Sequence, residues 1–410
     1  MLLREEERQM ILTAKRLIAG DGETVLQNSG LLLRDGRIAA VDTLSCLQNA
    51  YPEEEVLDYG EATILPGLID MHAHLAYWQA REDGKDFDPY LTACLALHNA
   101  KTALQRGVTT LRDVYSDDGL CRQIVRAGEK GLATVPRLIY CNRALCITGG
   151  IDWQITGGTV QVDGEWECRK AVRRELRTGA TWIKVMTSNR TPGVAEFTQQ
   201  ELDAIVDECH RLGQRAAAHA SLQPALQMCI DAGFDTIEHG TELTLAQVEQ
   251  MCQRGIAWTP TIFIHRFVLD RLARRTGRRD EVGLSGRDLQ TYHLYHRSLR
   301  CYADNFLRFA ETGVTLLAGT DLVFADSPFA AVSEELRCMV DLGLSPLRAI
   351  AAATGNCARV LGMQGEIGTL AAGAQADLLV VDGDAAAEIG ALEQVRAVYQ
   401  AGRSLPLPLV

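Results

Sequence analysis

The chain has 410 residues, of which 47% are hydrophobic and 23% charged, a composition typical of a globular protein that folds by itself and unlike that of a disordered chain. The formal net charge is -12, and no basic cluster offers a stripe for phosphate groups, which argues against nucleic acid and anionic membranes as partners. No run of 18 apolar residues occurs, and the acidic start lacks the apolar segment of a signal peptide. We therefore expect a cytoplasmic protein whose 12 cysteines are reduced.

Two segments at opposite ends of the chain have the sequence pattern of short β-strands separated by turns. In residues 9–66 the strand and turn pattern predicts four strands, at 9–14, 30–34, 37–42 and 62–65. After Leu361 a similar pattern returns, with residues 365–368 leading into a short apolar strand at 376–382. The economical interpretation is one β-sandwich built from residues 1–66 and 364–410, with residues 67–363 inserted between them as a separate domain.

The inserted domain alternates short apolar strands with amphipathic helices, which is the pattern of a parallel sheet covered by helices. A clear helix is expected over 198–212, where four apolar residues make one stripe. The predicted strands are 67–72, 108–114, 137–142, 182–187, 215–219, 236–239, 257–262 and 315–321. Eight such units predict an α/β fold, a (β/α)8 TIM barrel. Two long connections, 145–164 and 265–304, are expected to form loops or a lid on the active-site side.

The pair His72 and His74 stands at the end of the first predicted barrel strand. Residues two apart on a strand point to the same side, so both imidazoles could reach one metal ion. Taken alone, this spacing is a weak signal, because such pairs are more often incidental.

Other ionisable residues lie at the ends of further barrel strands. They are His219 after the fifth, His239 after the sixth and Asp321 after the eighth, and Lys184 lies within the fourth. Because the carboxyl ends of barrel strands converge on one face, these residues are expected to be neighbours of His72 and His74. Buried ionisable groups need partners, and a shared metal site supplies them.

Lys184 is the unusual member, since an ammonium group beside metal cations would be repelled. A buried lysine loses its charge readily, because burial lowers its pKa. The neutral amine can react with CO2 to form a carbamate, which offers carboxylate-like oxygen atoms to metal ions. We therefore hypothesise that Lys184 is carboxylated.

The ordered set of motifs resembles the amidohydrolase superfamily, in its prolidase-like and imidazolonepropionase-like branch, over essentially the full length. The segments that carry the resemblance are Ile64-Leu65-Pro66-Gly67-Leu68-Ile69-Asp70-Met71-His72-Ala73-His74, Gly107-Val108-Thr109-Thr110-Leu111-Arg112-Asp113, Ile183-Lys184-Val185-Met186, Ala218-His219-Ala220, Thr236-Ile237-Glu238-His239-Gly240, Ala318-Gly319-Thr320-Asp321 and the end of the chain from Gly365 to Asp382. The resemblance implies a distorted (β/α)8 barrel with a flanking β-sandwich and a site for two divalent metal ions, usually zinc.

The resemblance also implies a role for each residue. His72 and His74 hold the first metal, His219 and His239 hold the second, and carboxylated Lys184 bridges the two. Asp321 contacts the first metal and a bridging hydroxide that attacks a carbon–nitrogen bond, and then shuttles the proton to the leaving nitrogen. Asp113 and Glu238 are candidates for residues that do not bind the metal themselves but hydrogen-bond to its ligands and orient them.

The chain departs from its relatives where substrates are bound. Relatives commonly carry a histidine where this chain has Ile151, and those that cleave peptides often carry a tyrosine where it has Ser221. The substrate is therefore expected to be a small molecule with an amide, peptide-like or cyclic amide bond, and the sequence does not specify which one. Candidate substrate contacts are Tyr115, Tyr140, Asn142, Arg143 and His265.

Two alternatives stay open beside a binuclear hydrolase. The first is a mononuclear enzyme of the imidazolonepropionase or deaminase type, although deaminases typically have a glutamate where this chain has Leu222. The second is a non-catalytic barrel that binds a ligand and keeps its metal ligands only for structure. Helices on the outside of barrels commonly dimerise, so a homo-oligomer is also possible.

Overall fold

The computed structural model describes residues 9–76, 88–153, 157–188, 193–324 and 326–407. Its chain divides into two compact units. The first comprises Met1–Asp70, Lys101–Thr110 and Ala330–Val410, and the second comprises Met71–Ala100 and Leu111–Phe329. No helix of the described residues is long and apolar enough to cross a membrane.

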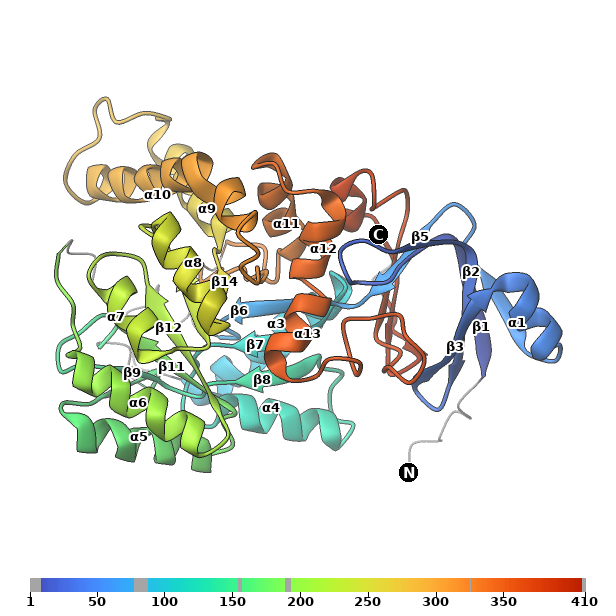
Figure 1. The fold of residues 1–410 in the computed structure, drawn as a ribbon, viewed down its shortest axis with the longest axis horizontal. Helices are drawn as coiled ribbons and strands as arrows, with labels where there is room; N and C mark the ends of the chain where they lie inside the picture. The colour runs from blue at the N-terminus through green and yellow to red at the C-terminus, as the bar shows by residue number, and fades with distance from the viewer. Residues whose placement is uncertain (1–8, 77–87, 154–156, 189–192, 325, 408–410) are drawn as a thin grey trace. The chain divides into compact units, whose positions relative to one another are not determined.

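The first unit is built on a mixed sheet to which both ends of the chain contribute (Figure 1). In spatial order β17, β16, β15, β5, β1, β2 and β3 are neighbours, and β4 also pairs with β1. The decisive pairing is β15 against β5, which is antiparallel with Leu378 opposite Pro66. The strands are β1 (Met10–Ile18), β2 (Val25–Arg34), β3 (Arg37–Thr43), β4 (Glu55–Asp58), β5 (Thr63–Pro66), β15 (Leu378–Val381), β16 (Val395–Gln400) and β17 (Arg403–Ser404). The predicted β-sandwich from both termini is confirmed.

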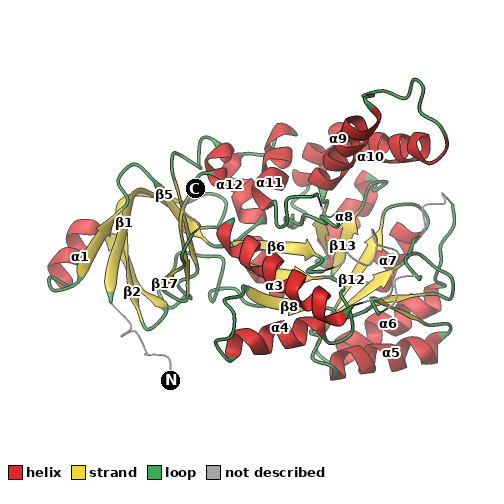
Figure 2. Ribbon diagram, turned by 180° about the vertical axis from the view of Figure 1, so that it is seen from behind, coloured by secondary structure: helices red, strands yellow, loops and turns green. Residues whose placement is uncertain are grey.

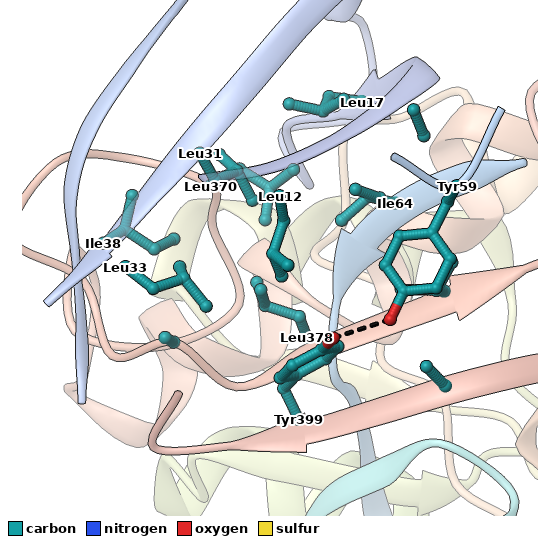
Figure 3. Close-up of a cluster of buried hydrophobic side chains, with 14 of the residues drawn as sticks. Leu12, Leu17, Leu31, Leu33, Ile38, Tyr59, Ile64, Leu370, Leu378 and Tyr399 are labelled. Atoms are coloured by element: carbon teal, nitrogen blue, oxygen red, sulfur yellow. Dashed lines mark hydrogen bonds between the residues drawn. The ribbon is translucent and has the colours of Figure 1, made fainter. Parts of the chain in front are cut away.

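Alternating apolar residues of these strands form a common core, drawn in Figure 3. Leu12, Leu31, Ile64 and Leu378 are fully buried in it. The only hydrogen bond drawn in this view joins the hydroxyl groups of Tyr59 and Tyr399 at 2.6 Å. Buried tyrosine hydroxyls need such partners, so the pair satisfies two polar groups in one contact.

The barrel consists of parallel strands, as the alternating pattern predicts. Two sheets are recognised, with the orders β6, β7, β8 and β10, β9, β11, β12, β13, β14. The third predicted strand, 137–142, corresponds to β8, which neighbours β7. The separate strand β9, which was not predicted, follows it and pairs with β11. The barrel strands are β6 (Leu68–Ala73), β7 (Val108–Asp113), β8 (Arg137–Tyr140), β9 (Ala144–Cys146), β10 (Thr159–Gln161), β11 (Trp182–Met186), β12 (Arg215–Ala220), β13 (Thr236–His239) and β14 (Ala257–Thr259).

The eighth barrel position, at residues 315–321, is hydrogen-bonded like a strand on both sides but carries only one isolated bridge, between Trp258 and Leu316. On one side the Trp258 amide donates to the Thr315 carbonyl at 2.9 Å. On the other, the Met71 amide donates to the Ala318 carbonyl at 2.9 Å. This segment therefore joins β14 to β6 and closes the barrel.

Helices cover the outside of the parallel strands, and Figure 2 shows α5, α6 and α7 beside β12. The helix predicted over 198–212 is α6, which starts with a capping box between Thr198 and Glu201. The described helices are α1 (Leu44–Ala50), α3 (Pro89–Gln105), α4 (Leu120–Glu129), α5 (Glu165–Arg177), α6 (Gln199–Arg211), α7 (Ala225–Ala232), α8 (Leu245–Arg254), α9 (Ile262–Thr276), α10 (Gly286–Ala310), α11 (Val332–Asp341), α12 (Pro346–Ala352), α13 (Gly355–Leu361) and the 3-10 helix η1 (Ile389–Glu393).

The two long connections are more regular than expected. Residues 265–304 are not a loop, because α9 and α10 occupy most of them. Their apolar stripes explain this, since Phe267, Tyr302 and Phe306 are buried and can pack only when helical periodicity puts them on one face. The described part of 145–164 contains β10, which extends the barrel sheet through β9.

Candidate metal centre

The second unit brings the side chains of all six predicted metal ligands together. His72, His219, His239 and Lys184 lie on β6, β12, β13 and β11, and His74 directly follows β6. Asp321 ends the segment that closes the barrel, where its amide donates to the His72 carbonyl at 2.8 Å. Residues far apart in sequence thus meet at the carboxyl ends of the strands, as the barrel fold requires.

Three of these residues form a compact set of possible ligand atoms. Asp321 Oδ1 lies 3.1 Å from His74 Nε2 and 3.5 Å from His72 Nε2. One ligand atom from each of the three residues lies within 4.8 Å of those from the other two. Among the residues that the structure describes, this is the one such group of histidine, cysteine or acidic side chains.

His219 and His239 form a second pair beside this set. His239 Nε2 and His219 Nδ1 are 2.9 Å apart, and the two rings meet at an angle of 67°. The rings of His72 and His239 have centroids 5.1 Å apart. The two halves of the predicted site are therefore contiguous.

Lys184 lies on β11, and its side chain is 1% exposed. Its Nζ is 3.5 Å from His72 Nε2. Burial lowers the pKa of the Lys184 amine, although the nearby carboxylates of Glu238 and Asp321 oppose this change. Burial therefore acts in the direction of the neutral, reactive form of the amine.

A second hydrogen bond orients each of three imidazoles. His72 Nδ1 donates to Glu238 at 2.7 Å, and His74 Nδ1 donates to the Tyr115 carbonyl at 3.2 Å. His239 Nδ1 lies 2.8 Å from the Thr261 hydroxyl. In each case the Nε2 atom is left to face the site, which is the usual arrangement of histidines that bind metals.

The backbone at three of these positions is left-handed, which is uncommon for residues other than glycine. The φ angles are 68° at His239, 52° at Thr261 and 50° at Asp321. At His239 this conformation breaks the strand alternation, so that both Glu238 and His239 contribute to the site although they are consecutive. Such strain costs about 1–3 kcal/mol per residue and is concentrated at functional sites.

The protonation states suit metal binding. Burial, helped by the charge of Lys184, lowers the pKa of His72 to about 4, and the same two causes lower that of His219 to about 3. Burial also opposes ionisation of Asp321, but its contacts with His72, His74 and His239 keep the pKa of that carboxyl well below its usual value. At neutral pH His72 and His219 are therefore neutral imidazoles and Asp321 is an ionised carboxylate, which are the forms that bind metals.

The distances also fit a divalent ion. Two ligand atoms on one tetrahedral zinc ion, at about 2.0–2.2 Å each, are separated by about 3.4 Å. The distances from Asp321 Oδ1 to Nε2 of His74 and to Nε2 of His72 are 3.1 and 3.5 Å, one below and one above this value. Nitrogen and carboxylate donors in this mixture are those that zinc prefers.

A pocket opens onto these residues within the second unit. Its apolar lining includes Met186, Ile264, Leu294, Val323 and Phe324. Its polar lining, besides the six predicted ligands, consists of Tyr115, Asp152, Ser188, Ser221, Thr241, His265, Tyr295, Arg297 and Ser298. The mixture of apolar walls and a few polar groups is typical of a small-molecule site.

Two predicted substrate contacts line this pocket. The Tyr115 ring lies edge-on to His74 with centroids 4.6 Å apart, and its hydroxyl donates to Asp152 at 2.8 Å. His265 lies in α9, and its Nδ1 donates to the Thr261 carbonyl at 3.0 Å. Burial lowers the pKa of His265 to about 4, so this residue is a neutral wall of the pocket at neutral pH.

The structure does not bring Tyr140, Asn142 and Arg143 to the pocket lining. Asn142 and Arg143 instead bind the fully buried Glu175, at 2.5 and 2.6 Å. An arginine near a strand end suggests a carboxylate partner from the sequence alone, but that partner is Glu175 of the same chain. Asn142 and Arg143 therefore have structural contacts that the sequence did not predict.

The family model for the amidohydrolase family matches residues 63–405. The chain belongs to the amidohydrolase family. It is accordingly a metal-dependent hydrolase of carbon–nitrogen bonds, and the set of His72, His74 and Asp321 is its candidate metal site.

Individual relatives of this amidohydrolase cover nearly all of the chain. It is 28% identical to ochratoxinase from Aspergillus niger over 96% of this chain and 85% of that protein. It is 24% identical to an imidazolonepropionase from Symbiobacterium thermophilum over 87% of this chain and 84% of the other. A solved Xaa-Pro dipeptidase with bound methionine superimposes with a TM-score of 0.84 at 26% identity, covering 97% of this chain and 99% of that one.

All three departures of this amidohydrolase from its relatives line the pocket. Ile151, Ser221 and Leu222 stand where related enzymes often carry a histidine, a tyrosine and a glutamate, and each is part of the pocket wall. The pocket therefore combines the expected metal ligands with these three side chains.

Sequence reasoning missed several residues of the amidohydrolase site. Thr261, Tyr295 and Arg297 belong to the segment from β14 to α10, which carries no motif. Thr261 could have been suspected, because it closely follows the seventh barrel strand. Arg112 was part of a matching segment, but nothing in its spacing showed that it reaches across the barrel to Glu238, where its Nη2 donates at 2.6 Å.

Proposed function

We propose that this amidohydrolase hydrolyses the carbon–nitrogen bond of a small amide with the help of two divalent metal ions, zinc being the expected metal. The observation that carries the proposal is the continuous set of six side chains around Asp321 and Lys184, in which two histidine pairs lie side by side. His72 and His74 would hold one ion, and His219 and His239 the other. Lys184, carboxylated by CO2, would bridge them.

Metal ions bound here would supply a water molecule activated for attack at neutral pH and would polarise the scissile carbonyl group. The protein residues then handle the proton. Asp321 is ionised and lies against both His72 and His74, so its carboxylate can accept a proton from the attacking water. The same group can deliver the proton to the leaving nitrogen, which otherwise would depart as a poor leaving group.

The pocket walls support a substrate with an apolar group on one side of the amide. Ile264, Val323 and Phe324 offer apolar contacts. The related Xaa-Pro dipeptidase and ochratoxinase suggest peptide-like amides as the first class to test. Ile151 and Ser221 do not supply the imidazole and the phenol group that many relatives carry at these positions, so we do not expect the chain to share their preference among dipeptides.

A mononuclear enzyme is the second candidate. It is favoured by the set of His72, His74 and Asp321, the one group among the described residues whose ligand atoms lie within 4.8 Å of one another. The likeness to imidazolonepropionase also favours it. In such an enzyme His219 and His239 would contact substrate or stabilise the attacked carbonyl. Leu222 stands where the proton-transferring glutamate of deaminases is expected, which disfavours deamination.

The deciding experiment combines a metal count with a substrate panel. Protein purified with zinc and bicarbonate is expected to hold about two metal ions per chain. It should hydrolyse members of a panel of N-acyl amino acids, dipeptides, aryl amides and cyclic amides, and a chelator should abolish this activity. A count near one ion with full activity would favour the mononuclear enzyme, and metal-independent hydrolysis would contradict both candidates.

A further inference from the structure

Arg112 is a charged residue buried completely inside the second unit, with no exposure to solvent. It lies on β7, next to the last residue of that strand. Its guanidinium plane lies over the Trp182 ring, 4.6 Å from the centroid. A buried charge of this kind is costly unless all of its donors are engaged, so the partners of Arg112 indicate what the residue does.

The donors of Arg112 reach two neighbouring parts of the metal centre. Nε donates to the carbonyl of Met71, the residue before His72, at 2.5 Å. Nη2 donates to Glu238 Oε1 at 2.6 Å, and Nη1 lies 3.1 Å from the hydroxyl of Thr236. Arg112 thus ties the backbone of β6 to side chains of β13.

Glu238 connects Arg112 to His72, because it accepts hydrogen bonds from both. It has no exposure to solvent, and its two oxygen atoms have different partners. Oε1 accepts from Arg112 and from the Thr236 hydroxyl, and Oε2 accepts from His72 Nδ1 at 2.7 Å. Because two donors face Oε1, the carboxylate cannot rotate without breaking a hydrogen bond.

We propose that Arg112 is a positioning residue of the metal centre, which acts through Glu238 and the Met71 carbonyl to keep the proton of His72 on Nδ1 and its Nε2 lone pair directed at the metal. His72 is held at both its backbone and its ring. The ring atom that faces the site, Nε2, lies 3.5 Å from both Asp321 Oδ1 and Lys184 Nζ. The inference rests on the proposed role of His72 as a metal ligand.

Glu238→Gln tests this arrangement, because glutamine keeps the size but offers only one acceptor. Arg112 and Thr236 both donate toward Oε1, so the amide oxygen must face them. The amide NH2 group then faces His72 Nδ1 and requires that atom to accept a hydrogen bond. The His72 proton moves to Nε2, where it blocks the lone pair that the metal needs.

Two measurements follow from this reasoning. Isotope-edited NMR of the metal-free enzyme should show the His72 proton on Nδ1 in the wild type and on Nε2 in the Glu238→Gln variant. Competition with a chelator should show metal affinity reduced by about 10- to 100-fold, which is the usual effect of losing a group that orients a ligand. Arg112→Met should weaken metal binding to a similar extent, and Arg112→Lys less, because lysine lacks the fork that spans these partners.

The chain offers a matched control in Glu175, another fully buried carboxylate bound by an arginine, Arg143. Glu175→Gln should lower stability without changing metal affinity or the His72 proton. If Arg112→Met fails to fold, Arg112→Lys and Glu238→Gln carry the test.

The possible outcomes separate two ideas. A wild type that binds no metal contradicts the proposed function itself. A wild type that binds metal, together with Glu238→Gln and Arg112→Lys variants that lose stability but keep metal affinity and the Nδ1 proton, would show that the Arg112 network is only structural and overturn this inference.

Discussion

His74 Nε2 lies 3.1 Å from Asp321 Oδ1, although the two residues are 247 positions apart in the sequence. The contact places a carboxylate directly beside the pair of histidines at the end of the first barrel strand. A carboxylate in this place can both complete a metal site and move protons, and these two functions can be separated by mutation.

Asp321→Asn is expected to lower kcat by about 100- to 10,000-fold, because asparagine cannot accept and return a proton. The amide oxygen can still face the metal, so metal content should stay near that of the wild type. Steady-state kinetics and metal analysis of the same preparation test this.

The matched control for that variant is Asp326→Asn. Asp326 has a half-exposed side chain and pairs with Arg271 at 2.9 Å on the surface, so its loss should leave kcat unchanged. Retained activity in Asp321→Asn would show that another group moves the proton.

Lys184→Ala should abolish activity and weaken metal binding, because it would remove the proposed bridging ligand. If the lysine acts as a carbamate, acetate or propionate should enter the cavity and restore part of the activity, since these ions supply the missing carboxylate. The measurement is the rate as a function of added carboxylate. Lys170→Ala, on the exposed side of α5, is the control. Rescue by a primary amine but not by carboxylates would contradict the carbamate hypothesis.

Ser221→Tyr is expected to shift specificity toward dipeptides, because Ser221 lines the pocket at the position where many peptide-cleaving relatives carry a tyrosine. A new hydrogen bond to a substrate carboxylate contributes about 1.5–3 kcal/mol, or about 10- to 100-fold in kcat/KM. Ser221→Phe is the matched control, since it adds the ring without the hydroxyl. An equal gain in both variants would assign the effect to packing instead.

Asp117→Asn should make the folded protein more stable at high pH. Asp117 is 8% exposed, and burial together with the nearby charge of Asp113 raises its pKa from 3.8 to about 7. The folded state therefore holds a proton that the unfolded state has released between these two pH values, and wild-type stability falls as pH rises through this window. The gain in folding stability of Asp117→Asn over the wild type grows from pH 3.8 to about pH 7 and is constant above pH 7.

Thermal melts at about pH 5 and about pH 8 test this expectation, with an increase in Tm of about 2 °C or more at the higher pH. Asp118→Asn serves as the control, because the neighbouring Asp118 side chain is 44% exposed. A gain for Asp117→Asn that is equal at both pH values would contradict the assignment.

The fold could be predicted because its signals are local. Short apolar strands alternating with helices such as α6 predict a barrel. A pattern of short strands and turns at both ends of the chain predicts a β-sandwich to which both termini contribute. The helices α9 and α10 were missed, because their apolar stripes are mixed with many arginines and a long connection without motifs suggests a loop. The segment of Asp321 was predicted as a strand but carries only one bridge.

The candidate ligands could also be predicted, because barrel topology requires strand ends to converge whatever the loops do. The substrate contacts could not. Tyr140, Asn142 and Arg143 lie at or just after the end of β8, as the metal ligands lie near the ends of their strands, but Glu175 on α5 engages Asn142 and Arg143. Which side chain meets which partner depends on helix packing, and spacing along the chain carries no such information.

By itself, the sequence of this amidohydrolase determined the order of its elements and the chemical identity of the histidines, lysine and aspartate at the strand ends. Only the tertiary structure decided how those groups are oriented. The proton of His72 is held by Glu238, and Glu238 is held by Arg112 from the opposite side of the barrel. Hydrogen bonds between residues so distant in sequence depend on strand register and burial, which exist only once the barrel has closed.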